Sequence, residues 1–177
     1  DKGNYDVLMR AWSGGQWGSV VPVAATDKFE AHASLACDAQ NRLWVAWNES
    51  GYQWGKDTGF LVKREGTRLY QWRWLKVAVY SGGQWQEPAA EFDTSMPRGL
   101  QGYNDLPQLT ADSSGRVWLT FRHRNLRIRD THSQTPAHRA AWENQITTYA
   151  GDRWITPMYL PSSQGRRDRP CAVGAGG

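Results

Sequence analysis

The sequence predicts an all-β fold, namely a β-propeller fragment with about two and a half blades of four antiparallel strands each. Two hairpin motifs that alternate along the chain indicate this fold. The motif D-x-x-x-R-x-W spans Asp38–Trp44 and returns at Asp112–Trp118, 74 residues later (118 − 44 = 74). A Gly-containing turn closed by tryptophan ends at Trp17, Trp85 and Trp154, at spacings of 68 (85 − 17) and 69 (154 − 85) residues. Two alternating hairpins make a repeat of four strands, as in a propeller blade.

The first expected element is a hairpin over residues 5–23. The β-like residues 5–12 and 17–23 flank Ser-Gly-Gly-Gln at 13–16, and a Gly-Gly pair favours a tight hairpin turn. The same turn recurs in the second hairpin of the following repeat. We therefore assign residues 5–23 to the last two strands of a preceding blade.

A full blade is expected over residues 31–92. Its first hairpin carries the D-x-x-x-R turn, and its second hairpin carries a Ser-Gly-Gly-Gln turn at 81–84. A long connection, 48–74, separates these two hairpins. The four strands are predicted at 32–38, 42–47, 75–80 and 85–92.

A second full blade is expected over residues 105–160. Its first hairpin surrounds the turn at 112–116, and residues 122–142 form a long connection to its second hairpin. The strands of that second hairpin are predicted at 143–149 and 153–160, and residues 169–175 are predicted as the first strand of a further blade. No segment has the 3.6-residue apolar period of an amphipathic helix strongly enough to compete with strand alternation.

The alternation of short and long connections predicts which face of the propeller carries function. In a meander of four strands, the first and third turns lie at one edge, and the other connections lie at the opposite edge. The long connections should therefore project from a single face, and they are 24–31, 48–74, 93–105, 122–142 and 161–169. Loops held on a rigid scaffold often carry binding sites, so we expect the site on this face.

Composition excludes several classes of partner. The 177 residues include 11 Trp and 18 Gly, which suit pleated strands joined by turns. The formal net charge of +4 fits solvated surface, with a face for an anionic ligand as the alternative. The chain has no long block of consecutive Lys and Arg residues, so no nucleic-acid partner is predicted. No apolar run reaches the roughly 20 residues that span a bilayer, so no membrane partner is predicted.

The two cysteines predict neither a disulfide nor a metal site. Cys37 and Cys171 fall on first strands of different repeats, two repeats apart, so they should not be neighbours. We expect both to be small buried residues. The chain has no C-x-x-C spacing, and no cofactor is predicted.

The ends of the sequence suggest a piece of a longer protein. The chain begins without Met and without a signal-peptide pattern, and its last residue falls where the next hairpin turn is due. We expect the remaining blades and further domains of that protein to be the partners of this segment. A secreted or periplasmic bacterial protein is the favoured source.

The Ser-Gly-Gly-Gln-Trp turns ending at Trp17 and Trp85 resemble a degenerate Asp-box of the sialidase-like propellers. They share the turn position, the glycine and the closing tryptophan, but both copies lack the aspartate. The resemblance implies a propeller in which the closing tryptophans plug the gaps between blades. The Arg-Ile-Pro motif and the arginine triad that sialidase chemistry needs cannot be matched here, so sialidase activity is not implied.

A second resemblance covers Trp154–Pro170, WITPMYLPSSQGRRDRP. This stretch looks like the strand and loop of propeller regions in large bacterial multidomain proteins. Some of those proteins carry a PHP-like metal-dependent hydrolase domain. The resemblance implies that the propeller is an accessory part and that catalysis lies in another domain.

Arginines gather in two of the long connections and predict an anionic ligand. Guanidinium groups recognise carboxylate, sulfate and phosphate, and a nearby histidine can assist them. The alternative is a solvated loop in which these cations pair with Asp130 and Glu143. The candidate residues are Arg122, His123, Arg124 and Arg127 in one connection and Arg166, Arg167 and Arg169 in the next.

Aromatic residues in the first long connection predict stacking on sugar rings. The candidates are Tyr52, Trp54 and Trp72, and the alternative is that they form a small local core.

The paired aspartates, Asp38 and Asp112, could suggest acid–base chemistry. Their equivalent positions in two repeats instead favour capping of turn N–H groups.

The sequence therefore predicts a non-catalytic binding or scaffolding module of a β-propeller. Its expected ligand is a glycan or another anionic polymer, held at the face of the long connections. The alternative is part of a sialidase-like glycoside hydrolase or lyase whose site is completed by further blades.

Overall fold

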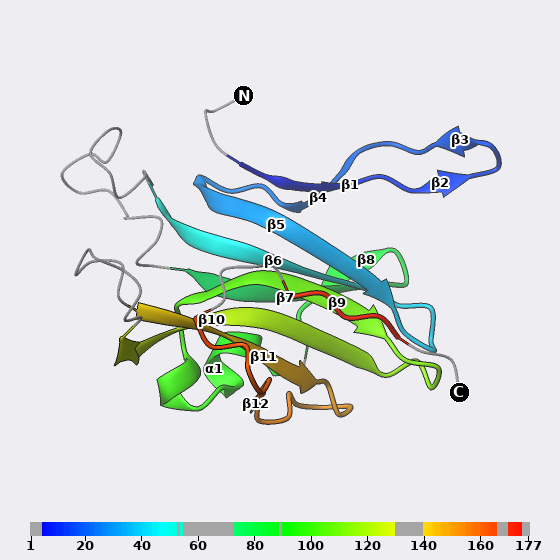
Figure 1. Cartoon of the computed structure of the whole chain (residues 1–177). Helices are drawn as coiled ribbons and strands as arrows, with labels where there is room; N and C mark the ends of the chain where they lie inside the picture. The colour runs from blue at the N-terminus through cyan, green and yellow to red at the C-terminus, as the bar shows by residue number, and fades with distance from the viewer. Residues whose placement is uncertain are drawn as a thin grey trace.

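The structure is a computed structural model that describes residues 5–52, 54, 73–88, 90–129, 140–165 and 170–174. The described chain is built almost entirely of antiparallel β-strands, as Figure 1 shows. The predicted all-β class is confirmed. No helix in these residues is long and apolar enough to cross a membrane.

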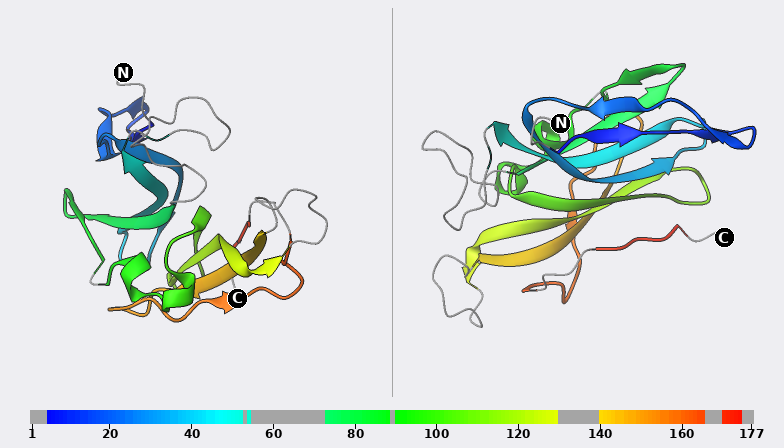
Figure 2. Two further views of the ribbon diagram at one scale, coloured as in Figure 1. Left: turned by 90° about the vertical axis from the view of Figure 1, so that its left-hand side faces the viewer. Right: turned by 90° about the horizontal axis from the view of Figure 1, so that it is seen from above.

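Two four-stranded sheets dominate the fold. In each sheet, every strand pairs antiparallel with the next strand along the chain, as in a propeller blade. The first sheet contains β5 (Lys28–Cys37), β6 (Leu43–Tyr52), β7 (Trp74–Ser81) and β8 (Gln84–Gln86). The second contains β9 (Asn104–Ala111), β10 (Val117–Arg129), β11 (Ala140–Thr148) and β12 (Met158–Tyr159). The two sheets splay apart from a contact between β9 and the strands β5 and β6 (Figure 2).

The N-terminal hairpin forms two short pairs of strands and lies beside the first sheet (Figure 1). The pairs are β1 (Val7–Met9) with β4 (Val21–Ala24), and β2 (Trp12–Ser13) with β3 (Gln16–Trp17). At the tip, Trp12 and Trp17 pack against each other at 5.2 Å and are 58% and 57% exposed. Besides Trp12, the Arg10 guanidinium lies over the Trp17 ring, 5.7 Å from its centroid, and the described residues leave Trp17 exposed. The expected place of Trp17 between two blades stays a prediction.

The D-x-x-x-R turn of the first sheet is held by its aspartate. Asp38 Oδ1 accepts hydrogen bonds from the backbone N–H groups of Gln40 (2.9 Å) and Arg42 (3.0 Å). Asp38 Oδ2 accepts from the Trp44 indole at 2.8 Å and from the Arg42 side chain at 2.7 Å. Burial alone would raise the pKa of Asp38, but these hydrogen bonds outweigh it and lower the pKa. The capping role predicted for this aspartate is confirmed.

The second sheet repeats the backbone and indole contacts of this turn. Asp112 accepts from the Arg116 N–H at 3.0 Å and from the Trp118 indole at 2.8 Å. The two turns also touch, because Ala39 N donates to Gly115 O at 3.4 Å. A Cβ at Gly115 would lie 2.3 Å from Ala39 Cβ, and its φ is +73°. Only glycine satisfies both demands at position 115.

The main core lies between the two sheets. Strand alternation turns Trp44 and Ala46 of β6 toward the second sheet, where Leu119 and Phe121 of β10 meet them. The other members of this core are Ala36, Leu75, Val77, Val79, Phe92, Met96, Leu109, Val117, Tyr149 and Trp154. Val45 and Trp47 face the opposite way and form a smaller core with Val7 and Ala78, next to half-buried Trp85. The predicted burial of the closing tryptophan is therefore confirmed for Trp154, which is 4% exposed.

Several predicted element ends are wrong. The strand expected at 85–92 ends at Gln86, and the short helix α1 (Phe92–Ser95) and the 3₁₀ turn η1 (Arg98–Leu100) follow. Phe92 is the first residue of α1, and its ring is buried between the sheets, 5.2 Å from Phe121. The strand expected at 153–160 is reduced to β12 and a bridge between Tyr149 and Trp154.

The second long connection is much shorter than predicted. Strand β10 continues to Arg129, and β11 begins at Ala140, so most of the expected loop 122–142 is sheet. No strand forms over the described residues 170–174, although Gly174 N donates to Thr110 Oγ1 of β9 at 3.0 Å. Cys37 and Cys171 are free, as expected, but both are exposed rather than buried. Cys37 belongs to the outward-facing row of β5, which also exposes Leu35.

Candidate functional site

The polar residues of the described chain gather at one edge of the two sheets. The start of β5, the end of β6 and the start of β7 meet there, together with the start of β9 and the middle of β10. In Figure 1 this is the left-hand edge, and the D-x-x-x-R turns lie at the right-hand edge. It is the edge from which the long connections were predicted to project.

A β-bulge occurs at the same place in both sheets of this edge. The residue pair at 32–33 in β5 and the pair at 106–107 in β9 each oppose a single residue of the next strand. His32 and Leu106 have positive φ angles of 57° and 52°, and they are 74 residues apart (106 − 32). The bulge bends the strand and releases backbone groups from the ladder, which makes them available at the edge.

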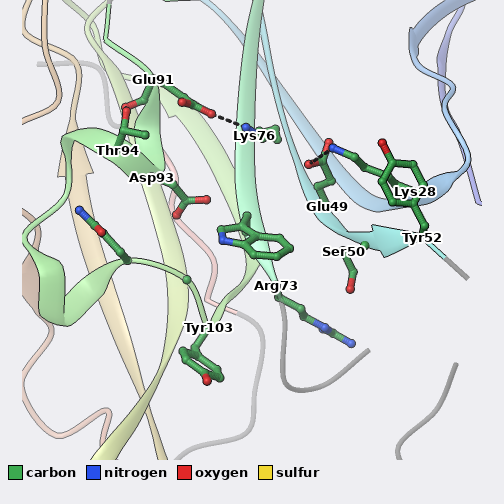
Figure 3. Close-up of a pocket in the computed structure, with 14 residues that line it drawn as sticks. Lys28, Glu49, Ser50, Tyr52, Arg73, Lys76, Glu91, Asp93, Thr94 and Tyr103 are labelled. Atoms are coloured by element: carbon green, nitrogen blue, oxygen red, sulfur yellow. Dashed lines mark hydrogen bonds and ion pairs between the residues drawn. The ribbon is translucent and has the colours of Figure 1, made fainter. Parts of the chain in front are cut away.

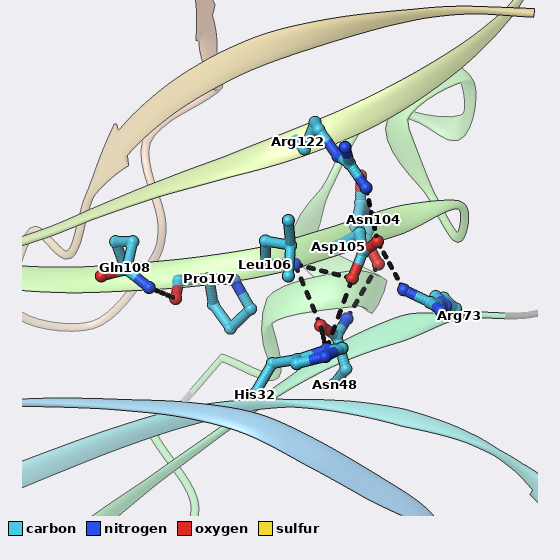
Figure 4. Close-up of polar contacts among 9 residues, drawn as sticks. All are labelled: His32, Asn48, Arg73, Asn104, Asp105, Leu106, Pro107, Gln108 and Arg122. Carbon is cyan, nitrogen blue, oxygen red and sulfur yellow. Dashed lines mark hydrogen bonds and ion pairs between the residues drawn. The ribbon is translucent and has the colours of Figure 1, made fainter. Parts of the chain in front are cut away.

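Asn48 uses the released groups to join the two sheets (Figure 4). Its Oδ1 accepts from Leu106 N at 2.9 Å, and its Nδ2 donates to Asn104 O at 3.0 Å. Asn48 is fully buried. A buried amide with these partners fixes the position of β9 relative to β6.

Asp105 lies at the centre of a buried charged cluster (Figure 4). Its side chain is 2% exposed, and its Oδ2 forms ion pairs with Arg73 and, at 2.9 Å, with Nη2 of Arg122. Its Oδ1 lies 3.8 Å from Nδ1 of His32. The Arg122 guanidinium also lies over the ring of Trp142, 4.1 Å from its centroid. Two guanidinium groups thus converge on one buried carboxylate.

This charged pair has no counterpart in the first sheet. At the offset of 74 residues, Asp105 corresponds to Ala31 and Arg122 corresponds to Asn48. The backbone pairing is equivalent, since Ala31 pairs with Asn48 and Asp105 pairs with Arg122. The bulged strand pair forms in the first sheet without charged residues at these positions. The Asp105–Arg122 pair is therefore not required for the bulge.

A cleft of about 550 Å³ opens beside this cluster (Figure 3). It lies between the ends of β6 and β7 and the segment 91–103. Its volume is in the range of small-molecule sites. We call it the polar cleft, and the lining residues used below are Lys28, Glu49, Tyr52, Arg73, Trp74, Lys76, Glu91, Asp93 and Tyr103.

Lysines and glutamates in the polar cleft neutralise one another. Lys28 Nζ lies 2.9 Å from Glu49 Oε1, and Lys76 pairs with Glu91. Burial would lower the pKa of Lys76, but the hydrogen bond to Glu91 and the charges of Glu91, Glu49 and Asp93 together outweigh it and raise the pKa. The cleft is therefore lined by paired charges rather than by an excess of one sign.

Asp93 is the most perturbed carboxyl group among the described residues. It is 7% exposed, and burial raises its pKa to about 7. Hydrogen bonds from Asn104 Nδ2 (3.3 Å) and Leu75 N (3.0 Å) and the charge of Lys76 act in the opposite direction. Asp93 can therefore hold or release a proton near neutral pH, at the wall of a cleft.

His123 lies on the other side of Asn104. Its Nδ1 is 2.9 Å from Asn104 Oδ1, and the residue is 4% exposed. Burial lowers the pKa of His123 to about 4, although a hydrogen bond with the backbone of Gly99 acts in the opposite direction. The imidazole is therefore neutral at physiological pH, and Asn104 links it to Asp93.

These two groups should give opposite pH dependences of stability. The folded pKa of Asp93 is raised, so its stabilising contribution is present below about pH 4 and is lost as the pH rises through about 7. The folded pKa of His123 is lowered, so its contribution is present above about pH 6.5 and is lost as the pH falls through about 4. We expect Asp93→Asn to lose stability on acidification from about pH 6.5 to 4.5, and His123→Asn to gain stability.

Urea unfolding of the protein and of both variants across this range measures the slopes. The wild-type slope should lie between those of the two variants. Parallel slopes in the two variants would contradict the opposite shifts of these pKa values.

The predicted site residues have different fates in the structure. Arg122, His123 and Arg124 lie in β10 rather than in a loop, because they pair with both β9 and β11. Arg122 and His123 are largely buried there. The predicted loop position of this arginine cluster is therefore wrong. The side chain of Arg127 and residues Trp72, Arg166, Arg167 and Arg169 lie outside the described part of the chain.

The two remaining aromatic candidates are described. Trp54 stacks on Tyr5 at 5.3 Å and meets Phe29 at 4.9 Å, which matches the alternative of a small local core. Tyr52 is 53% exposed and lies below Lys28 Nζ, 5.7 Å from the ring centroid. Tyr52 therefore stays available at the mouth of the polar cleft.

The sequence interpretation missed most of the residues that line the site. Arg73, Trp74, Asp93, Tyr103 and Asp105 were not chosen, although all lie within or beside the predicted long connections. Comparing the two repeats at the offset of 74 residues could have found Asp105, because Ala31 occupies its position in the first repeat. Asp93 left no such signal, because its role depends on burial.

Comparison with known proteins indicates the fold. No family model matches the chain, and no curated protein matches it. Among solved structures, the chain is similar to the Hadza microbial sialidase Hz136, with a TM-score of 0.54 and 12% identity over 84% of this chain. The chain spans 30% of the length of that sialidase. At this identity the likeness shows a sialidase-like β-propeller fold, and it lends no support to the PHP-like domain.

Among the described residues, no group of His, Cys, Asp or Glu side chains has the arrangement of a metal site. The side chains described at this edge carry carboxyl, guanidinium, ammonium, imidazole and aromatic groups.

Proposed function

We propose that the chain is a glycan-binding module of a sialidase-like β-propeller and that the polar cleft holds a sugar ring. The observation that carries this proposal is the combination of three aromatic side chains with paired charged groups around one cleft of about 550 Å³. A sugar has apolar C–H faces and a rim of hydroxyl groups. Both kinds of surface find partners in this cleft.

The aromatic side chains suit the faces of the ring. Tyr52, Trp74 and Tyr103 come from β6, β7 and the segment before β9, and all three line the cleft. Figure 3 shows Tyr103 on one side of the cleft and Tyr52 on the opposite side. Their rings provide large, rigid contact surfaces with little conformational entropy to lose.

The paired charges suit the hydroxyl groups. A carboxylate has about four acceptor sites, so Glu49 and Glu91 keep acceptor capacity after pairing with Lys28 and Lys76. Because the cations are neutralised, this cleft favours an uncharged glycan over a strongly anionic one. The anionic ligand predicted from Arg127, Arg166, Arg167 and Arg169 depends on groups outside the described chain and stays a separate prediction.

We expect Trp74→Ala to weaken glycan binding at least about tenfold, which corresponds to about 1.4 kcal/mol. The change removes the indole that lines the cleft from β7. A glycan array identifies the bound sugar, and calorimetric titration then compares the variant with the protein at low and high salt. Binding through stacking and hydroxyl contacts should depend little on salt.

Trp12→Ala is the matched control, because Trp12 is exposed in β2 and does not line the cleft, and β2 lies at the opposite, right-hand end of the molecule in Figure 1. It should leave the affinity unchanged. Binding that prefers sulfated or uronic sugars and disappears at high salt would overturn the proposed neutral ligand. Equal affinities in both variants would remove the polar cleft as the site.

A second candidate function is glycoside hydrolysis, and Asp93 is the observation that favours it. A carboxylic acid with a pKa of about 7 can donate a proton to a leaving oxygen near neutral pH. Glu49 and Glu91 supply further carboxyl groups at the same cleft. Release of nitrophenol from aryl glycosides tests this function. Turnover that Asp93→Asn abolishes without loss of sugar binding would support it, and binding without turnover would leave the non-catalytic module.

A further inference from the structure

The polar cleft adjoins a second hollow on the same side of the first sheet. This hollow has a volume of about 430 Å³ and lies between β4 and the strands β6, β7 and β8. Trp47 of β6 and Trp85 of β8 line it, so we call it the tryptophan hollow. Its other residues used here are Thr26, Lys28, Glu30, Glu49, Lys76 and Glu91.

The polar cleft and the tryptophan hollow share two ion pairs as their common boundary. Lys28 with Glu49 and Lys76 with Glu91 line both spaces. Figure 3 shows both pairs at the wall of the polar cleft. Carboxylate oxygens on this boundary are thus available to groups bound on either side.

The tryptophan hollow contains hydrogen-bond donors that lack acceptors. Within the described residues, the indole N–H groups of Trp47 and Trp85 are buried and have no hydrogen-bond partner. Trp47 is 8% exposed as a whole. A buried donor without an acceptor is energetically unfavourable, so two in one wall need an explanation. The indoles of Trp44 and Trp118 donate to Asp38 and Asp112, whereas the indole of Trp154 in the main core also has no partner among the described residues.

A buried carboxylate completes the wall of the tryptophan hollow. Glu30 is 1% exposed and accepts hydrogen bonds from Thr26 N at 3.1 Å and from Thr26 Oγ1 at 2.6 Å. The wall therefore combines two unpaired donors, a held carboxylate and two aromatic faces. Hydroxyl groups match this set, because each accepts from an indole N–H and donates to a carboxylate.

We infer that the polar cleft and the tryptophan hollow form one groove, which binds an oligosaccharide with one sugar unit in each space. This inference rests on the proposed glycan binding and adds that the ligand has at least two linked units. Two linked sugar units, one in each space, would meet at the Lys–Glu pairs. The hydroxyl groups next to their linkage would then contact these charged groups. A monosaccharide in the polar cleft alone would leave the two indole donors without acceptors.

Calorimetric titration with chito-, cello-, xylo- and galacto-oligosaccharides, from monosaccharide to tetrasaccharide, tests the inference. The oligosaccharides of the bound series should bind at least about tenfold more tightly than the monosaccharide. The variant Trp85→Phe removes one indole donor and keeps an aromatic ring. It should weaken oligosaccharide binding several-fold and leave monosaccharide binding unchanged.

Trp12→Phe is the matched control, and it should change neither affinity. Monosaccharide and tetrasaccharide affinities that agree in the wild-type protein would overturn the single groove, and this measurement needs no variant. An equal loss for both ligands in Trp85→Phe would also overturn it. If no oligosaccharide or monosaccharide binds, the proposed function fails and this inference fails with it.

Discussion

Replacing Trp44 with alanine should lower the free energy of unfolding by about 3–5 kcal/mol, because a large buried side chain is lost and a cavity remains. Trp44 is 2% exposed and sits in the main core between the two sheets. Its ring lies 4.9 Å from Tyr149 and 6.2 Å from Trp154. The indole N–H also holds Asp38 at 2.8 Å, so the turn loses a hydrogen bond as well.

Trp118→Ala is the matched control for this variant. Trp118 occupies the equivalent position of the second sheet and makes the same hydrogen bond, to Asp112 at 2.8 Å. It is only half-buried. The difference between the two variants in urea unfolding therefore isolates the packing of Trp44. Equal losses would contradict the assignment of the main core to the space between the sheets.

Replacing Asp105 with alanine should also lower the free energy of unfolding by about 3–5 kcal/mol. The carboxylate is 2% exposed and neutralises the guanidinium groups of Arg73 and Arg122, whose side chains are 7% and 12% exposed. Removing it leaves buried positive charge without this partner. The variant also loses the acceptor for Leu106 N at 2.8 Å, although Asn48 still accepts from that group.

Glu49→Ala is the control for the second prediction. It breaks the pair with Lys28, whose side chain is 30% exposed, and pairs at this depth contribute about 0–1 kcal/mol. Thermal and urea unfolding of both variants at low and high salt compare the two pairs. A loss in Asp105→Ala no larger than in Glu49→Ala would show that the cluster is solvated rather than buried.

Comparison of the two sheets separates scaffold from site. The turn aspartates, the tryptophans that bind them and the bulges recur at the offset of 74 residues. The residues at the opposite edge do not recur, as Ala31 and Asp105 illustrate. Positions that repeat therefore maintain the sheet, and positions that differ are where binding chemistry can be placed. Functional residues are commonly carried in this way, by variable positions on a constant scaffold.

The candidate site was only partly predictable. The edge from which the long connections project was predicted, because the lengths of the connections and the order of the strands determine it. The residues were not predictable, since the sequence predicts a loop at Arg122 and His123 and carries no signal for Asp93. Residues 122–125 are all polar, so apolar alternation does not indicate that β10 continues through them. Trp154, in contrast, was expected to be buried and is buried.

The sequence by itself determined the elements whose interactions are local. The D-x-x-x-R turns are such elements, because Asp38 and Asp112 bond to groups only two to six residues away. Only the tertiary structure decided the environment of Asp93 and Asp105. Their neighbours come from strands far apart in the chain, such as Leu75 N, 18 residues from Asp93, and Arg122, 17 residues from Asp105. Burial raises the pKa of Asp93, and Asp105 forms its ion pairs with Arg73 and Arg122, only when these distant segments pack together.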